Sequence, residues 1–162
     1  MEIFTRDIPP IRTALFVPAN RPDRVDKALD SGADMVIIDL EDAVPPAQKE
    51  EARESARAEL LEHKGERIAV RVNSLGSGFC NGDLQEVVVE GLSCIMLPKV
   101  EDPGHIREIA RRLLRVEREK GIEEGSVLVM PLIESALGVE KVFDILSQQT
   151  DPPRLLTAAF GA

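Results

Sequence analysis

The sequence has few aromatic residues: it contains five Phe, no Trp and no Tyr. Its core must therefore be built from Val, Ile, Leu and Ala, which suits buried parallel strands covered by helices. Cysteine is also scarce, with only Cys80 and Cys94, and no zinc-ligand spacing accompanies them. We therefore expect no structural disulfide and no zinc site, and we expect a reducing compartment such as the cytoplasm.

The chain lacks an excess of positive charge and lacks long apolar runs. It carries 20 Lys and Arg against 29 Asp and Glu, a formal net charge of −9. This balance argues against nucleic acid or an anionic membrane surface as a general partner, although a local Arg cluster or a metal can reverse the field inside one cleft. No run approaches the roughly 18 apolar residues that a membrane span needs, and residues 1–12 contain no apolar signal core.

Short apolar runs alternate with amphipathic segments along the whole chain, with no Pro, Gly or Ser linker between them. This organisation predicts a single domain over residues 1–162 built from parallel βαβ units. The expected strands are residues 13–18, 34–40, 67–72, 93–97, 126–133 and 155–160. The expected helices are residues 21–31, 45–63, 83–90, 103–120 and 135–149, with Asp83 opening the third of them.

Two architectures fit six strands and five helices: an open doubly wound sheet and a (β/α)8 TIM barrel. Periodicity does not choose between them. No G-x-G-x-x-G turn follows the first strand, which disfavours a dinucleotide-binding sheet. Because a complete barrel needs roughly 250 residues, we expect an incomplete α/β TIM barrel, truncated at the C-terminus, or a short relative that closes in another way.

Charged and amide side chains follow the carboxyl ends of the expected strands, where parallel α/β proteins place their chemistry. A charged group near a barrel mouth must be paired or desolvated, so their recurrence at one end of the sheet favours a functional site. The candidates are Arg21, Glu41, Asp42, Arg71, Asn73, Lys99 and Glu134.

Arg71 and Glu134 each carry two interpretations. Arg71 lies inside an apolar strand, where it serves either as a structural ion pair with Asp39, Glu41 or Asp42, or as a fork that binds a carboxylate or an enolate. Glu134 follows a long apolar run. It is either a ligand for a hard cation such as Mg²⁺ or an acid that interacts with the dipole of the next helix.

Five ordered blocks together resemble the citrate lyase β-subunit (malyl-CoA lyase) family. Residues 12–53, RTALFVPANRPDRVDKALDSGADMVIIDLEDAVPPAQKEEAR, look like the opening of that family. Four later blocks follow in the family's order: VRVNSLGSG, IMLPKVED, PLIESALG and AAFGA. The resemblance extends from Arg12 to Ala162.

The resemblance implies a TIM barrel, often trimeric, that uses Mg²⁺ to cleave or form a carbon–carbon bond beside a thioester. Citryl-, malyl- and citramalyl-thioesters are the typical substrates, and the products are an acyl-thioester and a 2-oxo acid. By motif, Arg71 resembles the arginine that holds the oxo acid, and Glu134 resembles the first Mg²⁺ ligand. Glu41 and Asp42 resemble the acidic pair that orders metal-bound water.

Weaker resemblances concern the binding of substrate. Arg21 and Lys27 resemble basic residues near the phosphates of coenzyme A, and Asn73 and Lys99 are expected to line the same mouth. In the family an acid a few residues after the FGA block supplies a second carboxylate to Mg²⁺, and that position lies beyond Ala162. We therefore expect this chain alone to be inactive or very weak, and to self-associate through uncovered apolar edges.

Two other functions remain open at the level of sequence. One is a related aldolase that acts on 2-oxo acids without coenzyme A. The other is a non-catalytic truncated paralogue that acts as a binding subunit. The residues do not distinguish coenzyme A from an acyl-carrier protein as the thioester carrier.

Overall fold

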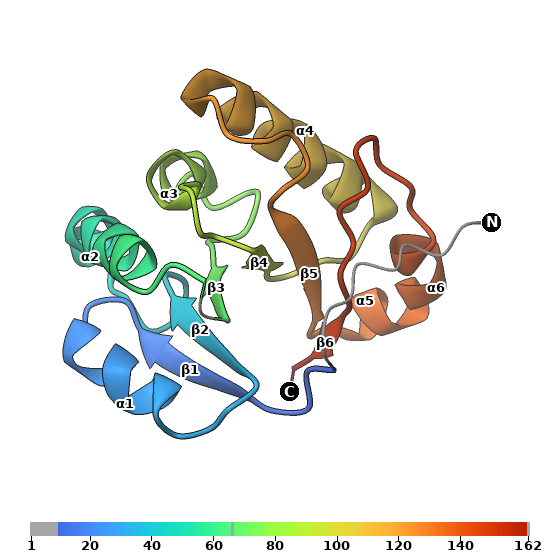
Figure 1. The fold of residues 1–162 in the computed structure, drawn as a ribbon. Coiled ribbons are helices and arrows are strands. Elements are labelled where there is room, and N and C mark those ends of the chain that lie inside the picture. Colours follow the sequence, from blue (N-terminus) through green and yellow to red (C-terminus); the bar gives the residue numbers. More distant parts are fainter. Residues whose placement is uncertain (1–9, 66, 162) are drawn as a thin grey trace.

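The computed structural model describes residues 10–65 and 67–161. Six parallel strands follow one another in chain order, β1-β2-β3-β4-β5-β6, and curl into an open half-barrel with helices along the outside (Figure 1). This arrangement confirms the expected incomplete TIM barrel and excludes a doubly wound sheet, whose strand order reverses. No helix in the described part of the chain is long and apolar enough to cross a membrane.

The first five strands agree with the expected runs, with small differences at their ends. Their bounds are β1 Ala14–Pro18, β2 Met35–Asp39, β3 Ile68–Arg71, β4 Cys94–Leu97, β5 Leu128–Ile133 and β6 Ala159–Phe160. The 3-10 helices are η1 Pro22–Arg24 and η2 Pro46–Gln48. The α-helices are α1 Val25–Leu29, α2 Lys49–Glu62, α3 Cys80–Val87, α4 Pro103–Lys120, α5 Ala136–Glu140 and α6 Val142–Leu146.

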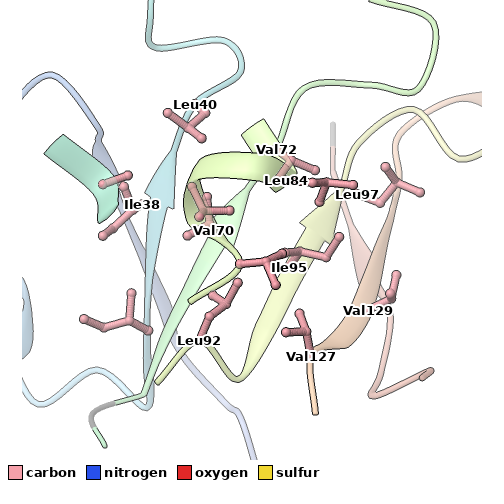
Figure 2. Packing of buried hydrophobic residues seen from close by; sticks show 14 of the residues in the cluster. Ile38, Leu40, Val70, Val72, Leu84, Leu92, Ile95, Leu97, Val127 and Val129 are labelled. Carbon is pink, nitrogen blue, oxygen red and sulfur yellow. The ribbon is translucent and has the colours of Figure 1, made fainter. Parts of the chain in front are cut away.

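Successive residues of each strand point to opposite faces of the sheet and build two separate cores. The larger core lies between the sheet and the outer helices, and Figure 2 shows part of it, including Ile38, Val70, Ile95 and Val129. The smaller core lines the inner face of the curl. It contains Met35, Ile37, Ala69, Cys94, Met96, Leu128, Met130 and Leu132. Both cysteines are free and buried, Cys94 on β4 and Cys80 at the start of α3.

Helix α4 matches its expected bounds because both of its ends carry strong local signals. Asp102 precedes the helix, and its carboxylate accepts a hydrogen bond of 2.7 Å from the backbone N–H of Gly104. Pro103 occupies the first turn, where its missing N–H costs nothing. Gly121 ends the helix with φ of 66°, a left-handed conformation that glycine adopts without strain.

The helices expected at residues 21–31 and 45–63 each open with a 3-10 helix, and three other expected elements differ more from the structure. The helix expected at residues 83–90 begins instead at Cys80, so Asp83 lies inside α3 and is fully buried. The helix expected at residues 135–149 is divided into α5 and α6, because Lys141 between them has φ of −96° and ψ of 7°, outside the helical region.

The sixth expected strand is shorter than residues 155–160. Leu155 forms an isolated bridge with Val129, whereas Ala159 pairs with Leu132. The segment from Leu155 to Ala159 therefore contains one more residue than the stretch of β5 that it faces, which interrupts the ladder as a β-bulge does.

A fully buried ion pair attaches the segment before β6 to helix α4. Arg154 donates to the two carboxylate oxygens of Glu117 at 2.8 and 2.6 Å, and it also donates to the carbonyl of Val127 at 2.8 Å. Burial alone would raise the pKa of Glu117, but hydrogen bonds from Arg154 and from the backbone N–H groups of Gly125 and Val127 hold that pKa below its ordinary value. Helix α4, β5 and the last segment are thus joined through one carboxylate.

We expect Arg154→Met to lower the free energy of unfolding by about 3–5 kcal/mol, because it leaves the Glu117 carboxylate buried without its cation. Since the pKa of Glu117 is lower in the folded state, its contribution is present above pH 4.5 and is lost as the pH falls toward the folded-state pKa. Urea unfolding at several pH values measures both effects. Arg118→Met, which removes an exposed pair with Glu124, is the matched control and should change little.

Candidate active site

Polar side chains gather where the inner face of the sheet meets the carboxyl ends of the strands. On β2 the side chains on the inner face are those of Met35, Ile37 and, at the carboxyl end, Asp39. On β3 they are those of Ala69 and, at the carboxyl end, Arg71. Asp39 and Arg71 are register partners across the two strands. On β5 the inner residues are Leu128, Met130 and Leu132, and the next inner position is Glu134. The apolar interior of the half-barrel is therefore closed at this end by a layer of charge.

Arg71 forms the structural ion pair that the sequence left open, and it also faces the cavity. Its Nε and Nη2 each donate at 2.7 Å to one oxygen of the buried Asp39 carboxylate. Its Nη1 lies 3.6 Å from Glu41 and 3.5 Å from Asp42, and its guanidinium stands 5.0 Å from the centre of the Phe16 ring. Asp39 thus fixes the guanidinium, while one edge remains directed at the two acids that follow β2.

Asp39 was not among the predicted site residues, yet it organises the turn that carries two of them. Its Oδ1 accepts from the backbone N–H of Glu41 at 2.9 Å, and its Oδ2 accepts from that of Ala43 at 3.0 Å. Burial tends to raise the pKa of Asp39, but Arg71 and these two N–H groups hold it below its ordinary value. The sequence offered Asp39 only as one of three possible ion-pair partners of Arg71, and the acid at the end of the apolar run 34–40 was the signal for a role in the site.

Glu41 is a buried carboxylate held on one side only. Its Oε1 accepts from the Nζ of Lys99 at 2.7 Å, and its Oε2 is buried without a hydrogen-bond donor among the described residues. Burial raises the pKa of Glu41, the nearby Asp42 adds to the effect, and the hydrogen bond from Lys99 opposes it. Glu41 therefore has the environment of a carboxyl group that keeps its proton to a higher pH than a surface glutamate does.

Lys99 contacts two acids at once. Its φ of 57° makes it the one non-glycine residue with positive φ in the described ranges, a strained conformation that recurs at functional sites. In this conformation its backbone N–H donates to Glu134 Oε1 at 2.7 Å, while its side chain binds Glu41. The sequence placed Lys99 in this mouth as a substrate contact, and the structure places it there between two carboxylates.

Two cavities open at this end of the sheet and share Asp42. The first, about 420 Å³, has an apolar floor of inner-core residues, and Phe16, Arg71 and Glu134 lie on its walls. The second, about 450 Å³, is lined by Glu41, Lys49, Asn73, Lys99, Ser74, Ser77 and Phe79, among others. Six of the eight predicted site residues therefore line one or both cavities: Glu41, Asp42, Arg71, Asn73, Lys99 and Glu134.

The other two predicted site residues lie elsewhere. Arg21 is exposed and pairs with Asp23 at 2.8 Å, and Lys27 is exposed on α1. Neither lines the two cavities. Asn73 does lie at the mouth, but its backbone N–H and its Nδ2 both donate to the buried Asp83 at 2.7 Å. Its side chain is thus engaged by the protein, and the predicted roles of these three residues in binding stay predictions.

The carboxylates that could hold a metal at this mouth are Glu134 and Asp42, which line the same cavity. Mg²⁺ takes one or two protein carboxylates and completes its shell with water and substrate oxygens. Over the described residues no group of three or more His, Cys, Asp and Glu side chains could hold a metal ion. The donor set therefore fits a Mg²⁺ site that depends on substrate or on further oxygen ligands, and it does not fit an all-protein cage.

A model of the HpcH/HpaI aldolase/citrate lyase family matches residues 12–162. The chain belongs to this family. Among curated members, the β subunit of citrate lyase from Leuconostoc mesenteroides subsp. cremoris is 38% identical over 136 residues, which is 83% of this chain and 45% of that protein. The L-malyl-CoA/β-methylmalyl-CoA lyase of Rhodobacter capsulatus is 31% identical over 156 residues, or 93% of this chain and 48% of that enzyme.

Solved structures of family members share the fold. The citrate lyase β subunit of M. tuberculosis complexed with oxaloacetate and magnesium has a TM-score of 0.67 and 34% identity, over 91% of this chain and 55% of that one. A structure of the M. tuberculosis protein with magnesium, acetoacetate and coenzyme A gives the same TM-score and identity, over 46% of its length. This chain thus spans about half the length of the family members that it matches.

We expect Glu41→Gln to make the protein more stable than the parent chain at neutral pH. Because the pKa of Glu41 is raised by folding, the folded state binds a proton more readily, so the parent loses stability as the pH rises above 4.5 toward the folded-state pKa. The variant lacks this loss. Urea unfolding between about pH 4.5 and 7.5 measures the difference in free energy of unfolding between the variant and the parent, which should widen as the pH rises. A constant difference would contradict the assignment, and Glu62→Gln on the exposed face of α2 controls for the loss of one acid.

Proposed function

We propose that this chain forms the substrate-binding half of a Mg²⁺-dependent carbon–carbon lyase. The reaction is cleavage of a 3-hydroxyacyl thioester of the citryl, malyl or citramalyl type to an acyl-thioester and a 2-oxo acid. The observation that carries the proposal is the position of Arg71. Its guanidinium is fixed by Asp39, has one edge directed at Glu41 and Asp42, and shares a cavity with Glu134.

In the cleavage the substrate hydroxyl loses its proton, the bond between the carbinol carbon and the α-carbon breaks, and the electron pair moves onto the thioester as an enolate, which then takes up a proton. Arg71 would donate hydrogen bonds to the oxo-acid oxygen as it becomes a carbonyl, in the manner of a preorganised oxyanion site. The Asp39 pair keeps that guanidinium in place throughout. Such preorganisation avoids reorganisation at the moment of reaction.

Glu41 and Asp42 would handle the proton, and Glu134 would hold the metal. Glu41 suits proton transfer because it is buried and its pKa is raised, as general acid–base catalysis near neutral pH requires. When bound, Mg²⁺ supplies Lewis acidity toward the carboxylate and the adjacent oxygen of the oxo-acid half. Lys99 keeps Glu134 oriented through its backbone N–H and neutralises Glu41 through its side chain.

The activities of the relatives support this proposal and point to one alternative. Relatives are called citrate lyase β subunits and malyl-CoA lyases, and one structure holds oxaloacetate and magnesium. The family description also includes aldolases, so an aldolase of free 2-oxo acids is the second candidate. A preference for a free aldehyde over a thioester as the acceptor in the reverse direction would identify it. The two free cysteines favour a reducing compartment, so we also propose a location in the cytoplasm.

Arg71→Lys tests the central assignment. We expect kcat for thioester cleavage to fall about 10²–10³-fold, because lysine keeps the charge but loses the fork that binds Asp39 and the oxo acid together. The assay follows Mg²⁺-dependent cleavage of malyl-, citramalyl- and citryl-thioesters, in this chain and in any longer natural polypeptide that contains it. Arg67→Lys is the matched control, since Arg67 precedes the same strand at its opposite end and donates to the carbonyl of Asp34.

We expect no turnover by this chain alone, because it spans about half the length of the lyases that it matches. Measurable cleavage by the 162-residue chain would show that this half of the barrel suffices, and unchanged kcat in Arg71→Lys would remove Arg71 from the mechanism.

Activation by the metal is tested separately with Glu134→Gln. That variant should require at least about tenfold more Mg²⁺ for half-maximal activity, whereas Glu140→Gln on the exposed side of α5 should require the same concentration as the parent.

We also propose that the chain self-associates. Large apolar side chains are exposed on β1 and at β6, including Leu15 at 42%, Phe16 at 44% and Phe160 at 66%, more than a monomeric surface favours. Sedimentation of the chain at several concentrations should reveal oligomers. Replacement of Phe160 by Ser should shift the equilibrium toward the monomer, and a monomer at all concentrations in the parent would contradict the proposal.

A further inference from the structure

Lys49 is a buried lysine that the sequence analysis did not single out. It is the first residue of α2 and only 5% of its surface is exposed. The buried stripe of that helix continues through Ala52, Ala56 and Leu60, so a lysine occupies a position where the helical pattern calls for an apolar residue. An unusual residue at such a position indicates a specific interaction.

The position disfavours a cation on two counts. Burial removes water from the ammonium group and lowers the pKa of Lys49, while the nearby acids Asp83, Asp39 and Glu41 oppose that effect. In addition, the first turn of a helix is the positive end of the helix dipole, which favours acids over bases. A lysine retained here must therefore make contacts that a neutral or apolar side chain could not make.

Those contacts are with the backbone of residues 40–43, the turn after β2 that carries Glu41 and Asp42 and is called the acidic turn below. The Nζ of Lys49 donates to the carbonyl of Leu40 and, at 2.7 Å, to the carbonyl of Glu41. The Phe79 ring lies 5.7 Å from the same nitrogen. Asn73 also donates to the Leu40 carbonyl, at 3.1 Å. The ammonium group thus binds the carbonyl side of the turn after β2.

Asp39 binds the N–H side of the same turn, through the amides of Glu41 and Ala43. The backbone that carries Glu41 and Asp42 is therefore held between a buried carboxylate on one side and a buried ammonium on the other. The direction of the two acidic side chains depends on this backbone, because each leaves it from within the clamped segment. Lys49 also lines the second cavity, beside Glu41 and Asp42.

We propose that Lys49 is a positioning residue: by binding the Leu40 and Glu41 carbonyls it fixes the acidic turn in the orientation that directs Glu41 and Asp42 toward Arg71. The catalytic part of this inference rests on the proposed function. The structural part does not, since it concerns the turn in this chain alone.

The experiment compares amide hydrogen exchange in the parent chain and in Lys49→Met, which has similar length but cannot donate. We expect the amides of Glu41 and Ala43 to exchange at least about tenfold faster in the variant, because the turn opens without its carbonyl anchor. The amides of Ile95 and Val129, in the centre of the sheet, should stay within about twofold. Lys49→Arg, which keeps a charged donor, should restore part of the protection.

Lys64→Met is the matched control, because Lys64 follows the same helix, is half-exposed and pairs with Glu90 at 2.9 Å. Unchanged exchange at residues 41 and 43 in Lys49→Met would overturn the proposal. A uniform increase across all four amides would overturn it too, because that result describes a general loss of stability. If Lys49→Met does not fold, Lys49→Ala, which also cannot donate, is measured by the same criterion.

The catalytic consequence has a separate readout. In a polypeptide that cleaves the thioester, Lys49→Met should lower kcat at least about tenfold and leave KM within about threefold, with partial recovery in Lys49→Arg. A change in KM alone would contradict positioning of the acids. If no form of the protein cleaves a thioester, the proposed function fails while the exchange data still decide whether Lys49 fixes the turn.

Discussion

The Asp39–Arg71 ion pair is the constraint on which the mouth of this half-barrel depends. Two register partners on neighbouring strands are directed at the inner face just above an apolar layer, where an unpaired charge of either sign would be costly. Their bidentate contact removes that cost and leaves the Nη1 edge of the guanidinium directed at Glu41 and Asp42. The same carboxylate also binds the turn that follows β2. One ion pair therefore determines both the orientation of the Arg71 guanidinium and the position of the two acids that face it.

A second set of buried polar contacts supports the mouth from the outer side. Asp83 on α3 accepts from Asn73 and from Arg53 of α2, and Asn73 and Lys49 donate to the carbonyl that follows β2. These contacts connect two helices and two strand ends through groups that are nearly all satisfied. A buried network of this kind favours one conformation strongly, since each member would be left unpaired in any other.

The two cores of the molecule differ in how fully they are covered. The outer core between sheet and helices is closed, whereas the inner core is bordered by exposed apolar residues on β1 and β6. In a closed (β/α)8 barrel those edges would be neighbours of further strands. The mouth built by β2 to β5 is nevertheless well formed, because its ion pairs and hydrogen bonds join residues of these strands and of the turns that follow them.

The sequence by itself determined the succession of strands and helices, because apolar runs and helix signals are local properties of the chain. It also determined which strand ends carry charge, and the family resemblance selected the barrel that periodicity alone did not. The tertiary structure decided what each charge does. Asp39 binds Arg71, and Lys99 adopts a left-handed backbone that directs its N–H at Glu134, across contacts between residues far apart in the chain. Such pairings depend on strand register and on the curl of the sheet, and neither is a local property that residue types or spacing can specify.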